Sequence, residues 1–164
     1  MHVSPRDALG AEAADCNVKY DKTVPCKTCP FLRTGLKLHP QRAEEIGGMM
    51  LSTQGGEFPC HMTIEHGEQD ETGDARLINR GQEVHCAGAL IFAEKNSTAT
   101  QMMRICERIG IYKPEGIIDS KSWDKVFDDF DEMVSAHTED WEKSRDKAKE
   151  HRNKDGNEHL PVDE

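Results

Sequence analysis

The sequence is poor in aromatic residues and contains no long apolar run. Phenylalanine, tryptophan and tyrosine make up 5% of the 164 residues, whereas charged residues make up 32%. A chain of this length forms one domain, but so few large side chains favour a modest core that would gain from a metal staple. No stretch approaches the roughly 18 consecutive apolar residues of a membrane span. We therefore expect a soluble protein that makes no membrane contact.

Signals for export and for hydrolytic catalysis are also missing. The first seven residues, Met-His-Val-Ser-Pro-Arg-Asp, lack the apolar centre of a secretory signal, so we expect a cytoplasmic protein. There is no Gly-x-Ser-x-Gly, no His-Glu-x-x-His and no phosphate-binding Gly-Lys-Ser/Thr loop. A protein without enzymatic activity is the better prediction.

Cysteine is the unusual component, with six in the chain. Because the cytosol keeps thiols reduced, these residues are interpreted as metal ligands or buried thiols rather than as disulfides. Cys26 and Cys29 form a Cys-x2-Cys turn between Pro25 and Pro30, which we call the Cys knuckle (residues 25–30). Such a turn presents two thiolates to one centre, and single cysteines from two other segments, Cys60 and Cys86, complete four ligands.

Histidines adjoin two of these cysteines, in the pairs Cys60-His61 and His85-Cys86. Successive side chains of an extended segment point to opposite faces, so each pair should supply one ligand. We prefer the cysteines and expect His61 and His85 to hydrogen-bond sulfur from outside the ligand set, or to act as alternative ligands.

The ligand pattern predicts an iron–sulfur cluster of the [4Fe–4S] type, with a zinc ion as the alternative. Zinc ribbons usually present two Cys-x2-Cys turns, whereas this chain has one turn and two isolated cysteines. Cys29-Pro30 also matches the Cys-Pro that ends a ferredoxin ligand run. Cys106 lies on an apolar stripe and is expected to fill core space, and the role of Cys16 stays open.

The ordered motifs resemble a family of small bacterial and phage proteins with CxxCP, CH and CAG cysteine motifs. They are Pro25-Cys-Lys-Thr-Cys-Pro-Phe, Phe58-Pro-Cys-His and Cys86-Ala-Gly-Ala-Leu-Ile-Phe. The resemblance covers about residues 24 to 112 and implies that the four cysteines act together and that the protein could be phage-encoded, in the cytoplasm of a bacterium or of a phage-infected bacterium. It implies no activity.

The predicted fold is a small α+β domain stapled by metal. Its expected parts are the Cys knuckle, a helix over 40–51, a short β-hairpin formed by 57–64 and 83–92 that carries Cys60 and Cys86, and a helix from Ser97 or Thr98 to Ile109. A last helix, amphipathic and acidic, begins near Ser120 or Ser122, with an apolar stripe from Trp123 to Trp141. We place a flexible N-terminal arm at 1–18, one metal-binding domain at 19–142 and a charged, disordered tail at 143–164.

The charge distribution predicts a protein partner. The net charge of -10 opposes direct binding to nucleic acid, yet bases predominate between residues 19 and 42 and acids between 119 and 142. The candidate partner-binding residues are Asp128, Asp131, Glu132 and Asp140 on the acidic helix, and Arg33 and Lys37 beside the Cys knuckle.

Together these features predict an iron–sulfur accessory or regulatory protein that binds a partner, such as a nucleic-acid-binding host protein like RNA polymerase, and so takes part in transcription regulation. The alternatives are a zinc-binding structural module that contacts nucleic acid, and a redox or electron-transfer protein.

Overall fold

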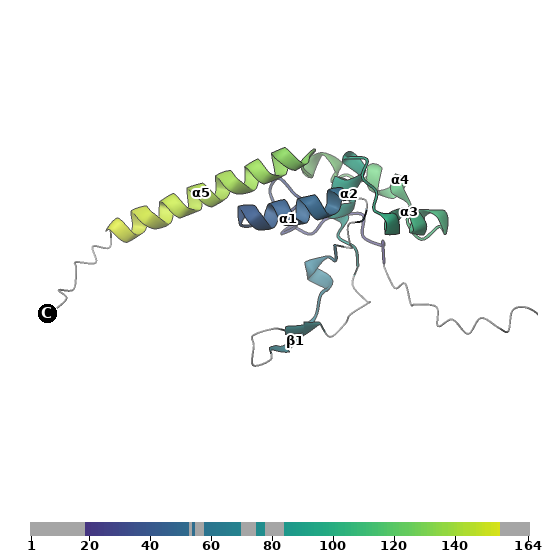
Figure 1. Cartoon of the computed structure of the whole chain (residues 1–164), viewed down its shortest axis with the longest axis horizontal. Coiled ribbons are helices and arrows are strands. Elements are labelled where there is room, and N and C mark those ends of the chain that lie inside the picture. The colour runs from purple at the N-terminus through teal and green to yellow at the C-terminus, as the bar shows by residue number, and fades with distance from the viewer. Residues whose placement is uncertain (1–18, 53, 55–57, 70–74, 78–83, 155–164) are drawn as a thin grey trace, which may run out of the picture.

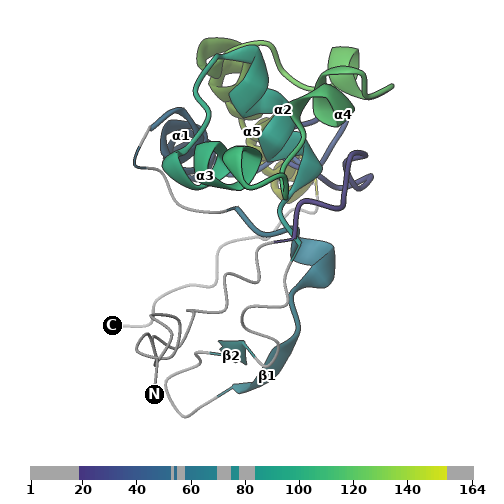
Figure 2. The same ribbon diagram turned by 90° about the vertical axis from the view of Figure 1, so that its right-hand side faces the viewer.

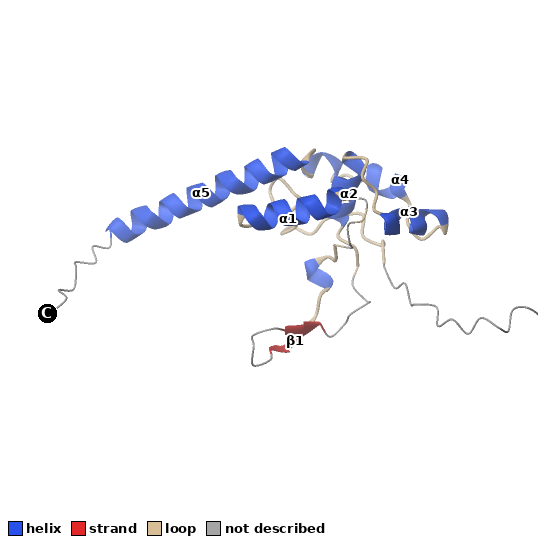
Figure 3. Ribbon diagram, in the orientation of Figure 1, coloured by secondary structure: helices blue, strands red, loops and turns tan. Residues whose placement is uncertain are grey.

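The computed structural model describes residues 19–52, 54, 58–69, 75–77 and 84–154, most of which are helical (Figure 3). The predictions for residues 1–18, including Cys16, lie outside the described residues. In chain order the helices are α1 (Pro40–Leu51), α2 (Ala87–Lys95), α3 (Gln101–Arg108), α4 (Pro114–Ile118) and α5 (Phe130–Lys154), with two 3-10 turns, η1 (His61–Thr63) and η2 (Trp123–Lys125). The α-helices gather into one body, from which the C-terminal half of α5 projects (Figure 1).

The predicted α+β fold is wrong, because the described core is built from helices. Two short strands, β1 (His66–Gln69) and β2 (Ala75–Leu77), pair antiparallel, and Figure 2 draws them apart from the helical body. Neither strand carries Cys60 or Cys86. The β-hairpin that was expected to deliver these two cysteines is therefore wrong as well.

The apolar run after Cys86 forms α2 rather than a strand. All residues from Ala87 to Ala93 are buried, so this helix occupies the centre of the body with apolar side chains on every side. A run that is apolar at each position carries no period that separates a strand from a buried helix. Pairing with a neighbouring strand is replaced by the internal hydrogen bonds of the helix, which satisfy the buried backbone without a partner.

Two helices predicted from local signals are confirmed. The helix expected over 40–51 is α1, and Pro40 stands at its start, where a missing N–H is harmless. The helix expected to end near Ile109 is α3, although Thr100 caps it by accepting a hydrogen bond from the Met103 N–H at 3.3 Å. Gly110 follows with a φ of 77°, the left-handed conformation that glycine adopts most easily.

The predicted last helix is broken into separate pieces. Val126 lies in an extended segment that bridges antiparallel to Leu32, and Phe127 N–H donates to the carbonyl oxygen of Phe31 at 3.1 Å. Helix α5 begins only at Phe130 and continues to Lys154, past residue 142, where the sequence analysis ended the domain. The apolar residues expected on one helix are therefore divided between two parts. Val126 and Phe127 lie in an extended segment that pairs with Phe31 and Leu32, just after the Cys knuckle, and the later residues lie on α5.

Helices α1 and α5 lie side by side (Figure 1) and approach closely at Gly47. A Cβ atom at Gly47 would lie 3.0 Å from the ring of Phe130 and 3.6 Å from the sulfur of Met133. The absence of a side chain at Gly47 thus allows α5 to pack closely on α1. Gly48 faces open space and takes no part in this contact.

Candidate metal centre

The Cys knuckle is a tight turn that buries one of its two sulfurs. Cys29 N–H donates to the carbonyl oxygen of Cys26 at 3.0 Å, and Leu32 N–H then donates to the carbonyl oxygen of Cys29 at 3.1 Å. Cys29 is fully buried, whereas Cys26 is half-buried at the surface. The turn therefore places one thiol in the core and one at the edge of the site.

Cys60 and Cys86 each stand at the residue before a helical turn. Cys60 precedes η1 and Cys86 precedes α2, and both are buried. Their segments meet at one antiparallel bridge, Pro59 with His85, where Cys60 N–H donates to the carbonyl oxygen of Val84 at 2.7 Å. This bridge, rather than a hairpin, brings the two cysteines to the same place.

Two of the four cysteine side chains, from the Cys knuckle and from the residue before α2, are in contact. The sulfurs of Cys29 and Cys86 lie 3.4 Å apart, within hydrogen-bond distance for two thiol groups. Burial raises the pKa of Cys26, and the negative charges of Cys60 and Cys86 raise it further, because all three sulfurs lie near one another.

Cys29 and Cys86 differ in how easily they ionise. The hydrogen bond to Cys86, and then burial, raise the pKa of Cys29, so Cys29 keeps its proton and donates. The same hydrogen bond lowers the pKa of Cys86, and so do the backbone N–H groups of Ala89 and Gly88 at the start of α2, against the opposing effect of burial. Cys86 is therefore the thiol of the pair whose pKa is lowered, chiefly by the hydrogen bond from Cys29 and to a smaller extent by the start of α2.

Gly88 leaves the space that the Cys29 sulfur occupies. A Cβ atom built on Gly88 would overlap that sulfur and would lie 3.2 Å from the Cβ of Phe31. The glycine of the Cys-Ala-Gly motif thus has a steric role at the site, which the sequence analysis did not assign to it.

The two histidines have different surroundings. His61 is exposed and places both ring nitrogens 3.9 Å from the sulfur of Cys26, while its Nε2 lies 2.9 Å from the hydroxyl oxygen of Thr28. His85 is buried, and its ring stacks on Tyr20 with the centroids 5.3 Å apart. Its Nε2 accepts a weak hydrogen bond from Phe58 N–H at 3.4 Å, and burial lowers its pKa to about 4. His61 adjoins the sulfurs, whereas His85 packs among aromatic rings.

Lys22 is a member of the site that the sequence analysis missed. Its ammonium group donates a hydrogen bond to the sulfur of Cys60 at 3.4 Å, and its charge also helps to lower the pKa of Cys86. In the sequence it is one of several bases near the knuckle, and no local motif distinguishes it.

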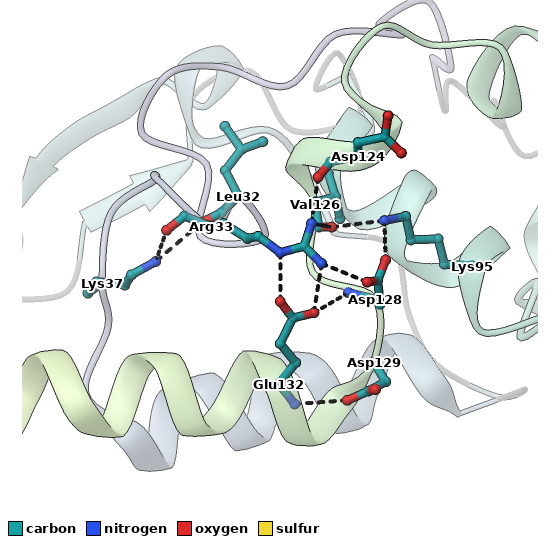
Figure 4. Close-up of polar contacts among 9 residues, drawn as sticks. All are labelled: Leu32, Arg33, Lys37, Lys95, Asp124, Val126, Asp128, Asp129 and Glu132. Atoms are coloured by element: carbon teal, nitrogen blue, oxygen red, sulfur yellow. Dashed lines mark hydrogen bonds and ion pairs between the residues drawn. The ribbon is translucent and has the colours of Figure 1, made fainter.

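Arg33, a predicted partner-binding residue, instead forms an internal network at the start of α5 (Figure 4). Its Nε donates to Glu132 at 2.6 Å and its Nη2 to Asp128 at 2.8 Å, while Nη1 donates to the carbonyl oxygen of Val126 at 2.8 Å. Lys95 completes the network by donating to Asp128 at 2.6 Å. These contacts attach α5 to the chain just after the Cys knuckle.

The other predicted partner-binding residues divide into two groups. Lys37 is partly buried and donates to the carbonyl oxygen of Arg33 at 2.6 Å. Like Arg33, it therefore makes contacts within the protein. Asp131 and Asp140 are exposed on α5. Their carboxylates remain accessible to a partner.

A second attachment of α5 to the Cys knuckle is His137, which the sequence analysis counted only within the apolar stripe. The ring is fully buried, and its Nδ1 accepts a hydrogen bond from Leu38 N–H at 2.9 Å. Nε2 therefore carries the proton and donates to the carbonyl oxygen of Pro30 at 3.1 Å. The histidine spans from α5 to the residue next to Cys29.

Among the residues that the structure describes, no three histidine, cysteine, aspartate or glutamate side chains are grouped so as to hold one metal ion. Within the same ranges, no helix combines the length and the apolar character that a membrane span requires. Comparison of the chain with protein-family models, with curated proteins and with solved structures finds no match. The family resemblance seen in the cysteine motifs stays a prediction. The fold and the site define a small helical protein with a buried cysteine cluster.

Proposed function

We propose that Cys26, Cys29, Cys60 and Cys86 bind an iron–sulfur cluster of the [4Fe–4S] type that staples three segments of the chain together. The observation that carries this proposal is the 3.4 Å approach of the buried sulfurs of Cys29 and Cys86, with Cys60 buried and Cys26 partly exposed, and all four unbridged. Cys29, Cys60 and Cys86 lie in the apolar core, whereas Cys26 is partly exposed at the Cys knuckle, so packing alone does not explain the position of the fourth thiol. When bound, the cluster supplies thiolate bonds that offset the small apolar core.

The sequence pattern, one Cys-x2-Cys turn with two isolated cysteines, is what favours a cluster over a single zinc ion. Zinc takes four ligands about 2.3 Å from one point and is the alternative occupant of the same cysteines. A [4Fe–4S] cluster takes one thiolate on each of four irons, so its ligands enclose a larger volume. The hydrogen bond between Cys29 and Cys86 belongs to the thiol form of the pair, and a metal takes the place of the proton.

A second candidate function is a redox-active dithiol, favoured by the 3.4 Å separation of Cys29 and Cys86 and by the thiolate character of Cys86. In that reaction the Cys86 thiolate would attack one sulfur of a small disulfide such as oxidised glutathione. That attack forms a mixed disulfide with Cys86 and releases one reduced thiol. Cys29 would then attack the Cys86 sulfur, so that a Cys29–Cys86 disulfide forms and the second reduced thiol leaves. Both sulfurs are buried, however, and exchange requires access to the attacking sulfur. Burial supports metal binding as the first choice.

The proposed role of the stapled protein is to bind a partner with a basic surface, in a reducing compartment such as the cytoplasm. Asp131 and Asp140 on α5 support this part of the proposal, because they are exposed and make no ion pair among the described residues. Charges of this kind steer association more than they add affinity.

The decisive test is the metal content of the full chain purified without oxygen. We expect brown protein with a broad absorption band near about 400 nm and about four irons per chain. Cys60→Ser and Cys86→Ser should each abolish metal retention, whereas Cys106→Ala, which removes a buried core sulfur, should keep it. His61→Ala and His85→Ala should also keep it.

Three results would change the assignment. Colourless protein with one zinc would remove the cluster and leave the four-cysteine site standing. Loss of metal from a histidine variant, with retention in the neighbouring cysteine variant, would exchange the ligand within that pair. Metal-free protein that forms a Cys29–Cys86 disulfide with oxidised glutathione would support the dithiol.

A further inference from the structure

Lys22 stands beside the cysteine cluster as a fixed positive charge. Its Nζ lies 3.4 Å from the sulfur of Cys60, and the pair is partly buried, so the interaction is screened less than at an open surface. The same charge acts on Cys86, which lies on another segment. Lys22 precedes the Cys knuckle in the sequence. Its ammonium group contacts Cys60 and acts electrostatically on Cys86, the two cysteines that lie outside the knuckle.

A site made of four thiolates has a charge problem that such a lysine addresses. Thiolates brought together in a buried place repel one another. Bound iron or zinc offsets only part of this negative charge. A hydrogen bond from an ammonium group to one sulfur offsets more of it, and hydrogen bonds to the sulfurs are among the factors that set the potential of a cluster.

We propose that Lys22 is the positioning residue of the metal centre: its ammonium group donates to the Cys60 thiolate, stabilises the occupied site and raises its reduction potential. This inference rests on the proposed function, because it concerns the occupied site. Reduction adds negative charge, and a nearby cation stabilises the reduced form more than the oxidised form. Removing the cation therefore lowers the potential.

The test replaces Lys22 by methionine, which keeps the length and apolar stem of the side chain but has no charge. Partners that hydrogen-bond metal ligands typically contribute 10- to 100-fold to metal affinity. We expect Lys22→Met to lose about that much affinity for cobalt(II), titrated into the full metal-free chain and followed by its thiolate absorption. In the iron-loaded chain, a dye-mediated redox titration should give a more negative midpoint potential. Lys22→Arg, which still donates a hydrogen bond and carries the charge, should recover both values.

Lys27→Met is the matched control. Lys27 lies within the Cys knuckle and is exposed, with no described side-chain contact to a sulfur, and its replacement changes the net charge by the same amount. It should leave the affinity and the potential close to those of the unsubstituted protein. An equal change in the two methionine variants would mean a general charge effect and would overturn the role of Lys22.

The outcomes separate this inference from the function on which it rests. Metal that binds equally well to Lys22→Met, at an unchanged potential, removes the inference and leaves the metal centre intact. A chain that retains neither cobalt nor iron removes the proposed function and the role of Lys22 together.

Discussion

Arg33 and Glu132, which are 99 positions apart in the sequence, form a two-point ion pair in which Nε and Nη2 of the guanidinium group donate to the two carboxylate oxygens at 2.6 and 2.9 Å. Glu132 also accepts the N–H of Asp128 at 2.7 Å, and its own N–H donates at 2.8 Å to the carboxylate of Asp129, which caps the start of α5. The ion pair therefore fixes the start of α5 to the segment that follows the Cys knuckle.

Removing one side of this pair should loosen α5. Both side chains are about one-third exposed, so we expect Glu132→Gln to lower the free energy of unfolding by about 1–2 kcal/mol, measured by urea denaturation. The control is Arg42→Gln, which breaks the exposed pair with Glu45 within α1 and should change little. Equal losses of unfolding free energy in the two variants would show that the Arg33–Glu132 pair stabilises the protein no more than an exposed ion pair does.

The stability of the protein should fall as the medium becomes acidic, and His137 should account for part of the fall. Burial, and then the charge of Lys37, lower the pKa of His137, against the opposing effects of the Pro30 carbonyl and Asp140. The unfolded chain then takes up a proton near pH 6.5, which the folded chain resists. The contribution of His137 is therefore present above about pH 6.5 and is lost as the pH falls toward the lower folded-state pKa.

Buried His85, with its pKa of about 4, acts in the same direction, so the full effect should extend from about pH 6.5 to about pH 4. The measurement is the free energy of unfolding at several pH values in this window. His137→Gln should show a shallower dependence than the unsubstituted protein, because one of the two depressed groups is gone. An unchanged slope would mean that the buried ring of His137 does not resist protonation.

Two glycine substitutions should have opposite effects. Gly88→Ala places a methyl group on the Cys29 sulfur, and overpacking of this kind should cost about 1–3 kcal/mol and impair metal retention. Gly48→Ala adds the same methyl group in the helical interior of α1, where it meets open space, and should stabilise the protein by about 0.5–1 kcal/mol. Thermal unfolding and metal analysis measure both. Unchanged thermal stability and metal retention in Gly88→Ala would show that the position of the Cys29 sulfur against Gly88 is not required.

The proposed partner contact should depend on exposed acids only. Replacing both Asp131 and Asp140 by lysine should weaken or slow binding of a basic partner without loss of metal, and the binding should weaken as salt rises. Asp128 and Glu132 are unsuitable for this test, because their reversal breaks the network with Arg33. If the affinity for the partner changes neither with salt concentration nor in the variant with both aspartates reversed, the contact lies on another surface.

Local chemistry determined several features from the sequence by itself. Pro40 marked the start of α1, Gly110 marked the end of α3, and the two cysteines between Pro25 and Pro30 specified a tight turn. Each of these features depends on backbone preferences or hydrogen bonds within a few residues, so the information lies in a short window. The joint action of Cys26, Cys29, Cys60 and Cys86 stays a prediction, which rests on the chemistry of thiolate ligands rather than on any fold.

Only the tertiary structure decided how these parts are used. The run after Cys86 is a helix because the surrounding helices bury it on every side, and Val126 is extended because it pairs with Leu32. Arg33 and Lys22 look alike in the sequence, as bases near the Cys knuckle. One meets carboxylates at the start of α5 and the other meets a sulfur, because a charge acts on what the folded chain places within a few ångströms of it, and sequence distance does not record that.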